Sequence, residues 1–234
     1  MMKSIHAIFS YNLYLGNNWH FAIEPYYQYL YDIPVEDDET QGYYFLNTQS
    51  GVVTLPTNSG GTSTNIGFDL NVEKNFDNNF NLMANFSFYD SKYKLPGGHE
   101  FNTTFNSRFA SNLTLGKEFH LNKGRAIQWG ARFIYNGGFR YTPVDLVNST
   151  AETGALPDYS RVNEAQVDPY FRLDHRLAYR FNGKRFSGIV SLDVQNILNT
   201  KNIRSVAYDP ETKETSYTYY PGGLIPVLGV KFDF

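Results

Sequence analysis

Apolar and polar residues alternate at every second position along most of this chain. In the run that begins at Phe80, Leu82 and Phe86 share its parity, whereas Asn81 and Asn85 fall between them. A period of two residues places successive side chains on opposite faces of a β-strand. We find no convincing helical spacing of apolar positions in any stretch of ten or more residues. The pattern therefore predicts an all-β protein whose strands have one apolar and one polar face.

Nine such runs follow one another along the chain. They are longer than the roughly 5 to 6 residues of an average strand in a soluble domain. A tilted strand needs roughly 9 to 11 residues to cross a bilayer, so most of these runs are long enough to span a membrane. The predicted runs are Ile5–Leu15, Trp19–Tyr31, Ile66–Glu73, Phe80–Phe88, about Phe105–Phe119, Ile127–Tyr135, Tyr170–Phe181, Phe186–Ile197 and Leu224–Phe234.

The connections between the runs fall into two classes. Short turns follow the first, third, fifth and seventh runs, and long segments rich in Gly, Thr, Asn, Pro and acidic residues follow the others. In an antiparallel sheet, alternate connections lie at the same end. Bacterial outer-membrane barrels have short turns at the periplasmic end and longer loops outside. The pattern predicts part of an antiparallel transmembrane β-barrel.

The seventh run shows which parity faces lipid. Arg172, Asp174, Arg176 and Arg180 share one parity. Each arginine would destabilise the protein by roughly 2–4 kcal/mol if it faced lipid near the midplane. We therefore expect this parity to face the lumen; the apolar parity contains His175, which the pattern does not explain. Such residues could contact a plug inside the lumen or line a substrate path, and a generic polar wall with cross-strand pairing is at least as good an interpretation of any one of them. The candidate lumen-facing residues are Arg108, Arg132, Arg172, Asp174, Arg176, Arg180 and Asp193.

Composition narrows the class of protein. The 234 residues are 17% aromatic, with net charge -3 and no cysteine, which excludes disulfides, thiolate metal sites and a cysteine nucleophile. The chain contains no run of about 20 apolar residues, which is the length that a membrane-spanning helix needs. Aromatic residues gather at both ends of the runs, as at the two interfaces of a bilayer. The charge balance gives no indication of a nucleic-acid partner.

Catalytic and metal-binding motifs are not apparent. The five histidines lack ligand spacing, so the sequence predicts no metal site and no cofactor. The chain has no Gly-x-Ser-x-Gly elbow, and an enzyme is not expected, although a serine paired with His20 or His175 stays open as a hydrolase alternative. The acidic residues between Asp32 and Glu39 could hold calcium, but they lack the spacing of a calcium loop, and a solvated loop is the simpler interpretation.

The last nine residues, PVLGVKFDF, place Leu228, Val230, Phe232 and Phe234 on one parity. This segment resembles the C-terminal strand by which outer-membrane barrels are recognised for assembly. The resemblance implies that these four residues form an assembly signal and that the barrel-assembly machinery is a partner.

Three further segments resemble strands of TonB-dependent receptors. They begin at Ser191 (SLDVQNILNTKN), Phe171 (FRLDHRLAYRF) and Glu24 (EPYYQYLYDIPV). In that family a 22-stranded barrel encloses an N-terminal plug, so the resemblance implies that residues 1–234 are the C-terminal portion of the barrel domain, without a plug. It also implies an outer-membrane location in contact with lipid. The family takes up a scarce ligand, such as a metal chelate, vitamin or glycan, with the plug and TonB as partners.

An odd number of strands agrees with this interpretation. Single-chain bacterial barrels have an even strand number, so nine strands indicate a fragment or a truncated reading frame. Three alternatives stay open: a passive porin or small barrel, a barrel hydrolase, and a soluble β-sandwich binding module.

Overall fold

The computed structural model describes residues 1–16, 18–36, 41–47, 56–183 and 186–233. Within these ranges every long element is a β-strand, and the only helical segments are three short 3-10 turns. No helix in these ranges is long and apolar enough to cross a membrane.

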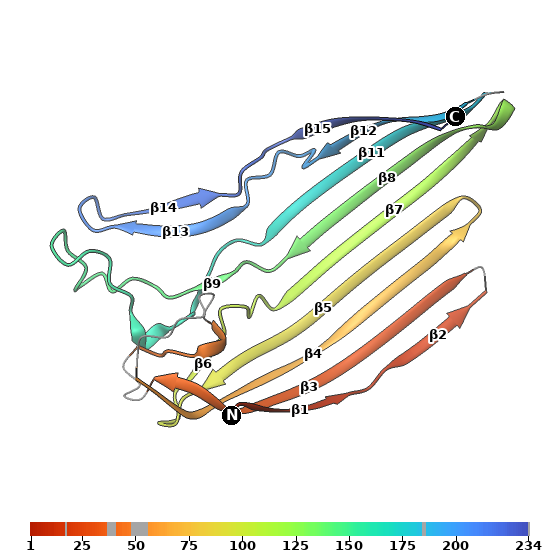
Figure 1. The fold of residues 1–234 in the computed structure, drawn as a ribbon. Coiled ribbons are helices and arrows are strands. Elements are labelled where there is room, and N and C mark those ends of the chain that lie inside the picture. The colour runs from red at the N-terminus through yellow and green to blue at the C-terminus, as the bar shows by residue number, and fades with distance from the viewer. Residues whose placement is uncertain (17, 37–40, 48–55, 184–185, 234) are drawn as a thin grey trace.

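The main antiparallel sheet is nine strands wide, if β1 and β2 are taken as one interrupted strand. Long strands that follow one another in the chain are neighbours in this sheet (Figure 1). The predicted all-β fold and its nine strands are confirmed, although several strands extend beyond their predicted ends. The first position is divided between β1 and β2. The strands are β1 (Lys3–Ile8), β2 (Tyr11–Leu15), β3 (Trp19–Glu36), β4 (Thr57–Asp77), β5 (Phe80–Lys94), β7 (Phe109–Leu121), β8 (Arg125–Asn136), β11 (Tyr170–Asn182), β12 (Ser187–Gln195) and β15 (Ile225–Asp233).

The remaining elements are short and belong to the connections. β6 extends the sheet beside β5, β9 pairs with β10, and β13 pairs with β14 in a hairpin outside the main sheet. Their bounds are η1 (Phe45–Asn47), β6 (Glu100–Asn102), η2 (Asn122–Gly124), β9 (Arg140–Tyr141), η3 (Tyr159–Arg161), β10 (Ala165–Gln166), β13 (Ile203–Asp209) and β14 (Glu214–Tyr219).

Pro25 explains why the first strand is divided. β1 ends opposite Tyr26 and β2 resumes opposite Ile23, so the interruption faces Pro25 and its neighbour. Proline has no N–H to donate to a ladder. Its carbonyl still accepts a hydrogen bond from the backbone N–H of Phe9 at 3.1 Å.

Short turns lie at one end of the sheet and long loops at the other, on the right and left of Figure 1. The turns use residues that tolerate a left-handed backbone: Asn78 and Asn79 have φ of 50° and 62°, and Gly124 has φ of 69°. The predicted asymmetry between turns and loops is confirmed. We call the two ends the turn end and the loop end.

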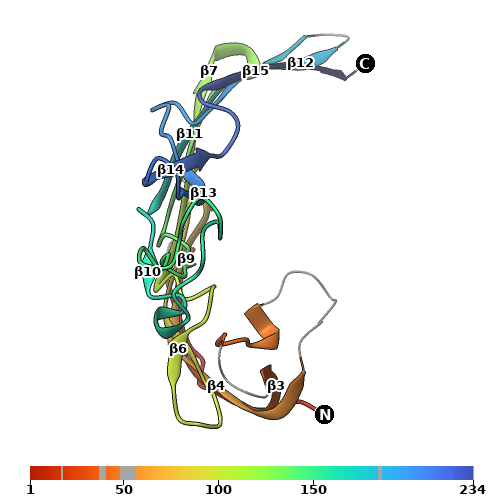
Figure 2. The ribbon, with the colours of Figure 1, turned by 90° about the vertical axis from the view of Figure 1, so that its left-hand side faces the viewer.

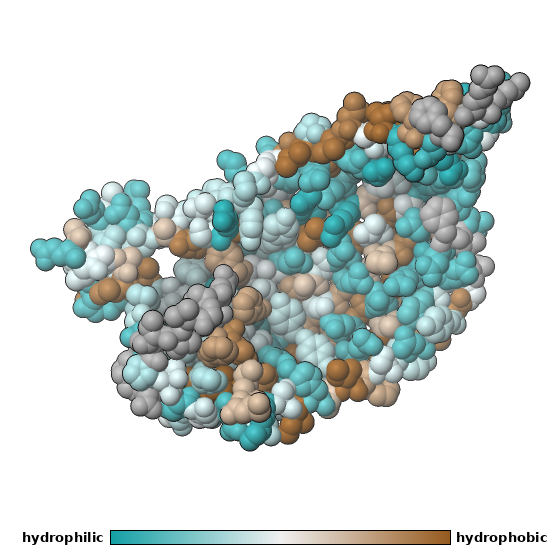
Figure 3. Space-filling view, in the orientation of Figure 1, coloured by the Kyte–Doolittle hydropathy of each residue, from teal (hydrophilic) through white to brown (hydrophobic). Residues whose placement is uncertain are grey.

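The main sheet is a single curved layer (Figure 2). Its two edges, β1 with β2 and β15, do not pair with each other, so the sheet is open. The soluble β-sandwich alternative is wrong for this sheet, because no second sheet packs face to face against it within the described ranges. The concave surface is largely hydrophilic (Figure 3). We call it the polar face and the opposite surface the apolar face.

A small hydrophobic core lies on the polar face at the loop end of β3 and β5. Tyr44, beside η1, stacks on Tyr93 with ring centroids 4.3 Å apart, and the Tyr93 hydroxyl donates to the carbonyl of Gly42 at 2.7 Å. Ile33 and Val35 of β3 are fully buried in the same cluster. The segment around η1 therefore folds inward over the concave surface, as Figure 2 shows.

Candidate functional site

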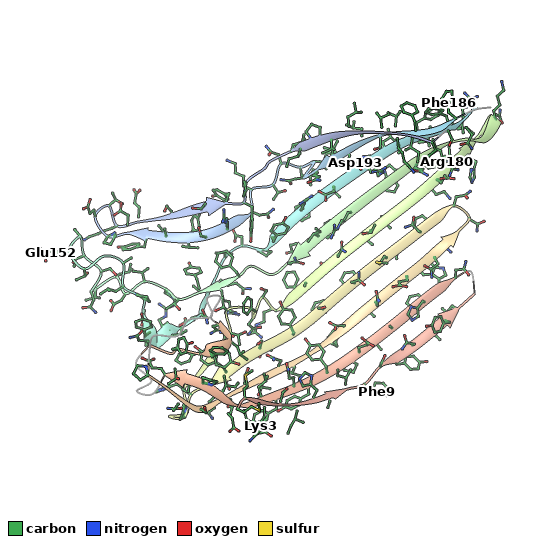
Figure 4. All side chains as sticks on the ribbon, viewed as in Figure 1. Lys3, Phe9, Glu152, Arg180, Phe186 and Asp193 are labelled. Atoms are coloured by element: carbon green, nitrogen blue, oxygen red, sulfur yellow. The ribbon has the colours of Figure 1, made fainter. Side chains whose placement is uncertain are left out.

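The strand register brings most of the predicted charged residues together. Arg176 on β11 is the register partner of Asp193 on β12, and Asp174 is the partner of Arg132 on β8. Residues of equal parity share one face of a strand, and Figure 4 labels Arg180 and Asp193 on neighbouring strands. The residues that lie together on the polar face are Arg132, Arg172, Asp174, Arg176, Arg180 and Asp193.

Two arginines on this face are paired with its aspartates. Arg176 Nη1 lies 2.8 Å and 3.0 Å from the two carboxylate oxygens of Asp193. Arg172 Nε donates to Asp174 Oδ1 at 2.6 Å, and its Nη2 donates to Gln195 Oε1 at 3.0 Å. The pairs join neighbouring strands or neighbouring positions of one strand, so they hold the charges in a fixed arrangement.

Glu118 on β7 is a member of this network that the sequence analysis did not single out. Its carboxylate accepts from Arg180 Nη2 at 2.8 Å and from Gln128 Nε2 at 2.7 Å. Only 8% of Glu118 is exposed, so the ion pair satisfies a carboxylate that is largely removed from water. The sequence feature that could have identified Glu118 is its position on the polar parity of the fifth run.

Arg132 differs from the other arginines of the network. Its Nε donates to Asn112 Oδ1 at 3.2 Å. In the described part of the chain, Arg132 forms no ion pair. Its register partner Asp174 is paired with Arg172 instead, so Arg132 is the arginine of this network without a carboxylate at ion-pair distance among the described residues.

Arg108 does not join this network. It precedes β7 with φ of 73°, and its Nη1 lies 3.0 Å from Asp90 Oδ1 at the loop end of β5. Asp90 is the register partner of Ile66, so it lies on the apolar parity. Arg140 lies nearby, buried by the loops, where it donates to the carbonyl of Asn106 at 2.7 Å. Its burial and the charge of Arg108 lower the pKa of Arg140.

Three carboxylates occupy the polar face of β3 and β4. Glu24 and Asp69 are register partners, so two acidic side chains lie directly opposite each other. Glu73 lies opposite His20, with 3.7 Å between a carboxylate oxygen and Nδ1. Ser10 donates to Glu24 at 2.6 Å. No lysine or arginine of the described residues pairs with these three carboxylates.

Tyrosines line the loop end of the polar face. Tyr26, Gly67 and Tyr89 form one row across β3, β4 and β5. A Cβ at Gly67 would lie 2.8 Å from the Tyr26 hydroxyl, so glycine leaves the space that this ring occupies. Two pockets of about 550 Å³ and 420 Å³ adjoin this row, and Tyr89 lines both of them.

The apolar face contains a partner for His175. The indole N–H of Trp129 donates to His175 Nε2, and the two ring centroids are 5.8 Å apart. This contact explains a polar residue on the apolar parity.

Aromatic rings cluster at the turn end of the apolar face. Phe181, Phe186 and Phe232 contact one another with centroids 6.0 to 6.4 Å apart. At the loop end, Tyr217 and Tyr219 lie on the β13–β14 hairpin and not in the main sheet. The aromatic band expected for the sheet therefore does not include them.

β15 forms an exposed edge. Leu228, Val230 and Phe232 share the apolar face and are 73%, 55% and 50% exposed. Phe232 is the register partner of Gly188, where a Cβ would meet its ring at 3.0 Å. The fourth residue of the expected assembly signal, Phe234, lies outside the described residues.

No group of three or more potential ligands among the described residues could hold a metal ion. His20 contacts Asn12 at 2.9 Å and stacks on Tyr14, and His175 contacts Trp129. Neither imidazole has a serine partner within the described ranges. Part of the acidic segment considered for calcium, residues 37–39, lies outside them.

The sequence and structure were compared with known proteins. A family model described as TonB dependent receptor-like, beta-barrel matches residues 6–197. The chain belongs to this family of TonB-dependent receptor β-barrels. The comparison with curated proteins finds no match.

Solved receptors share the fold. The chain is similar to the ferric-catecholate import receptor Fiu from E. coli K12, with a TM-score of 0.66 and 15% identity, over 98% of this chain and 27% of that chain. It is similar to the ferripyoverdine receptor of the outer membrane of Pseudomonas aeruginosa, with a TM-score of 0.55 and 9% identity over 98% and 26%. The FrpB iron transporter from Neisseria meningitidis gives a TM-score of 0.52 and 13% identity over 98% and 31%. The chain thus spans about a quarter to a third of these receptors.

Proposed function

We propose that this chain is part of the wall of an outer-membrane receptor that takes up a scarce ligand, such as a metal chelate, vitamin or glycan, in a TonB-dependent manner. The observation that carries the proposal is the division of nine consecutive strands into a concave polar face and a convex apolar face. Fiu, the ferripyoverdine receptor and FrpB are named for iron import or ferric ligands, which supports uptake as the class of function.

The polar face would line the lumen. Arg132, Arg172, Asp174, Arg176, Arg180 and Asp193 face one side, and turning the sheet inside out would expose the arginines to lipid at roughly 2–4 kcal/mol each near the midplane. We propose that Arg108 lies instead at the outer rim. Its pairing with Asp90 supports this position.

A plug domain would cover part of this face. The carboxylates Glu24 and Asp69 lie opposite each other without a basic partner in the described residues, and like charges in this position destabilise a sheet. Basic side chains of a plug would offset this repulsion. The surplus charge of Arg132 would likewise contact an acidic or polar group of the plug or the transported ligand.

The β15 edge would serve in assembly. Leu228, Val230 and Phe232, together with Phe234, would form the signal recognised by the barrel-assembly machinery. The apolar parity and exposure of the first three support this role. The replacement of both phenylalanines by alanine is expected to impair assembly of the receptor into the outer membrane.

Photo-crosslinking in the receptor polypeptide that carries these strands tests the orientation of the wall. A photoreactive amino acid at Asn112, on the polar face of β7, should crosslink to the plug or another protein segment. The same group at Leu113, the next residue and on the apolar face, should crosslink to lipid. Equal lipid crosslinking at both positions would contradict a lumen-facing polar face.

A further inference from the structure

The loop end of the polar face differs chemically from the rest of that face. Two pockets of about 550 Å³ and 420 Å³ lie side by side there, and both are lined by Tyr89; together they extend across the loop ends of β3, β5, β8 and β11. Each volume lies within the roughly 300–1,000 Å³ of a typical small-molecule site. We call this feature the tyrosine groove.

Aromatic rings form much of its surface. Tyr26 lines the smaller pocket, Tyr170 and Tyr220 line the larger one, and Tyr89 lines both. Tyr170 and Tyr220 meet edge to face with centroids 5.9 Å apart. Such rings offer flat apolar faces together with hydroxyl groups at their edges.

The groove is nearly free of charge. None of the described residues that line the smaller pocket is ionisable apart from its tyrosines, and the larger pocket adds only Asp168 and Arg172. Arg172 is already paired with Asp174 at 2.6 Å. A ligand with several negative charges would need cations to replace its hydration, and the described residues that line the groove do not supply them.

Amides and hydroxyls provide the other groups of the smaller pocket. Thr103 donates to Ser91 at 2.9 Å, Ser91 donates to Asn65, and Asn65 donates to Gln28 at 2.7 Å. This chain fixes the direction of each group and leaves oxygen lone pairs for further donors. The pattern suits hydroxyl groups, which both donate and accept.

From this combination we infer that the tyrosine groove binds a neutral oligosaccharide, whose pyranose faces stack on the tyrosine rings and whose hydroxyls bond to the amides. The inference rests on the proposed uptake function and narrows its ligand class from the three considered to a neutral glycan. It assigns the central contact to Tyr89.

Binding to the purified full-length receptor in detergent tests the inference. The probes are maltohexaose, cellohexaose, mannohexaose and xylohexaose, measured by saturation-transfer NMR and calorimetry, with a ferric tris-catecholate as the anionic alternative and a neutral hexapeptide as the peptide alternative. At least one oligosaccharide should bind. Tyr89→Ala should weaken that binding about tenfold, as expected when one stacked ring is lost.

Two matched variants separate stacking from a change in the fold. Tyr89→Phe keeps the ring and should retain most of the affinity. Phe88→Ala removes a ring from the adjacent position on the apolar face and should leave affinity unchanged. Heat-modifiable mobility on gels shows whether each variant is folded.

Several outcomes would overturn the inference. They are the absence of binding by every oligosaccharide, equal affinity in the wild type and Tyr89→Ala, or Tyr89-dependent binding of only the ferric chelate or the peptide. Uptake is measured separately in cells with and without TonB. Tyr89-dependent glycan binding without TonB-dependent accumulation would leave the groove assignment intact and refute the uptake function.

Discussion

The two halves of the polar face differ in how their charged side chains are paired. On β7, β8, β11 and β12, Arg176 pairs with Asp193 and Arg180 pairs with Glu118. On β3 and β4, Glu24 faces Asp69 and no arginine lies between them. The first half is largely neutralised by its own strands, whereas the second retains negative charge. The difference shows that ion pairs within the sheet balance the charge of one half, whereas those of the other half leave its carboxylates without a basic partner among the described residues.

The largest effect is expected in the self-neutralised half. Glu118→Leu leaves the Arg180 guanidinium without its carboxylate, and Arg180 Nε already lacks a hydrogen-bond partner in the described structure. We expect the free energy of unfolding to fall by about 1–3 kcal/mol, the usual cost of a lost hydrogen bond to a charged group. Urea titration of the receptor in lipid vesicles measures it.

The double variant Glu118→Leu with Arg180→Leu is the control for this prediction. It removes both charges, so much of the lost stability should return. No loss in the single variant would mean that this half does not depend on its internal pairs.

In the acidic half, removing charges is expected to stabilise the protein instead of destabilising it. Neutralising both carboxylates, as Glu24→Gln with Asp69→Asn, should stabilise a barrel from which the plug has been deleted by about 0.2–1 kcal/mol, because a repulsive cross-strand pair is removed. In the receptor with its plug, the same change should lower the thermal midpoint. Equal shifts in the two forms would contradict a basic partner on Glu24 and Asp69.

The smallest effect is expected for Arg176 and Asp193. Half of the Arg176 side chain and 29% of that of Asp193 are exposed, and exposed pairs typically contribute about 0–1 kcal/mol. Asp193→Asn should therefore shift the urea midpoint less than Glu118→Leu. A larger shift for Asp193→Asn than for Glu118→Leu would contradict the expectation that the more buried ion pair contributes more to stability.

Periodicity predicted the strands because the two faces of each strand meet different surroundings. Arg172, Asp174 and Arg176 alternate with Phe171 and Leu173, and this alternation predicted their common face before any neighbour was known. Proline chemistry explains why the first strand is divided opposite Pro25. Arg108 was assigned to the same face by parity, but its left-handed backbone removes it from strand geometry.

The partners of these residues could not be predicted from the sequence. Glu118 and Arg180 are 62 residues apart, and the acceptor for Trp129 is His175, 46 residues away. Such pairs depend on how β7, β8 and β11 are aligned, and a shift of one residue would exchange the two faces. The tyrosine groove also needs this alignment, because its rings come from separate strands and loops.

By itself, the sequence determined the strand periodicity, the order of the nine strands, the turn and loop ends, and the resemblance to TonB-dependent receptors, since these depend on local backbone chemistry and on which side chains tolerate hydrocarbon. Tertiary structure alone decided which charges neutralise each other, which carboxylates remain unpaired and where the tyrosines gather. The physical reason is that electrostatic pairing and stacking depend on distances of a few ångströms between strands, and only the register sets those distances.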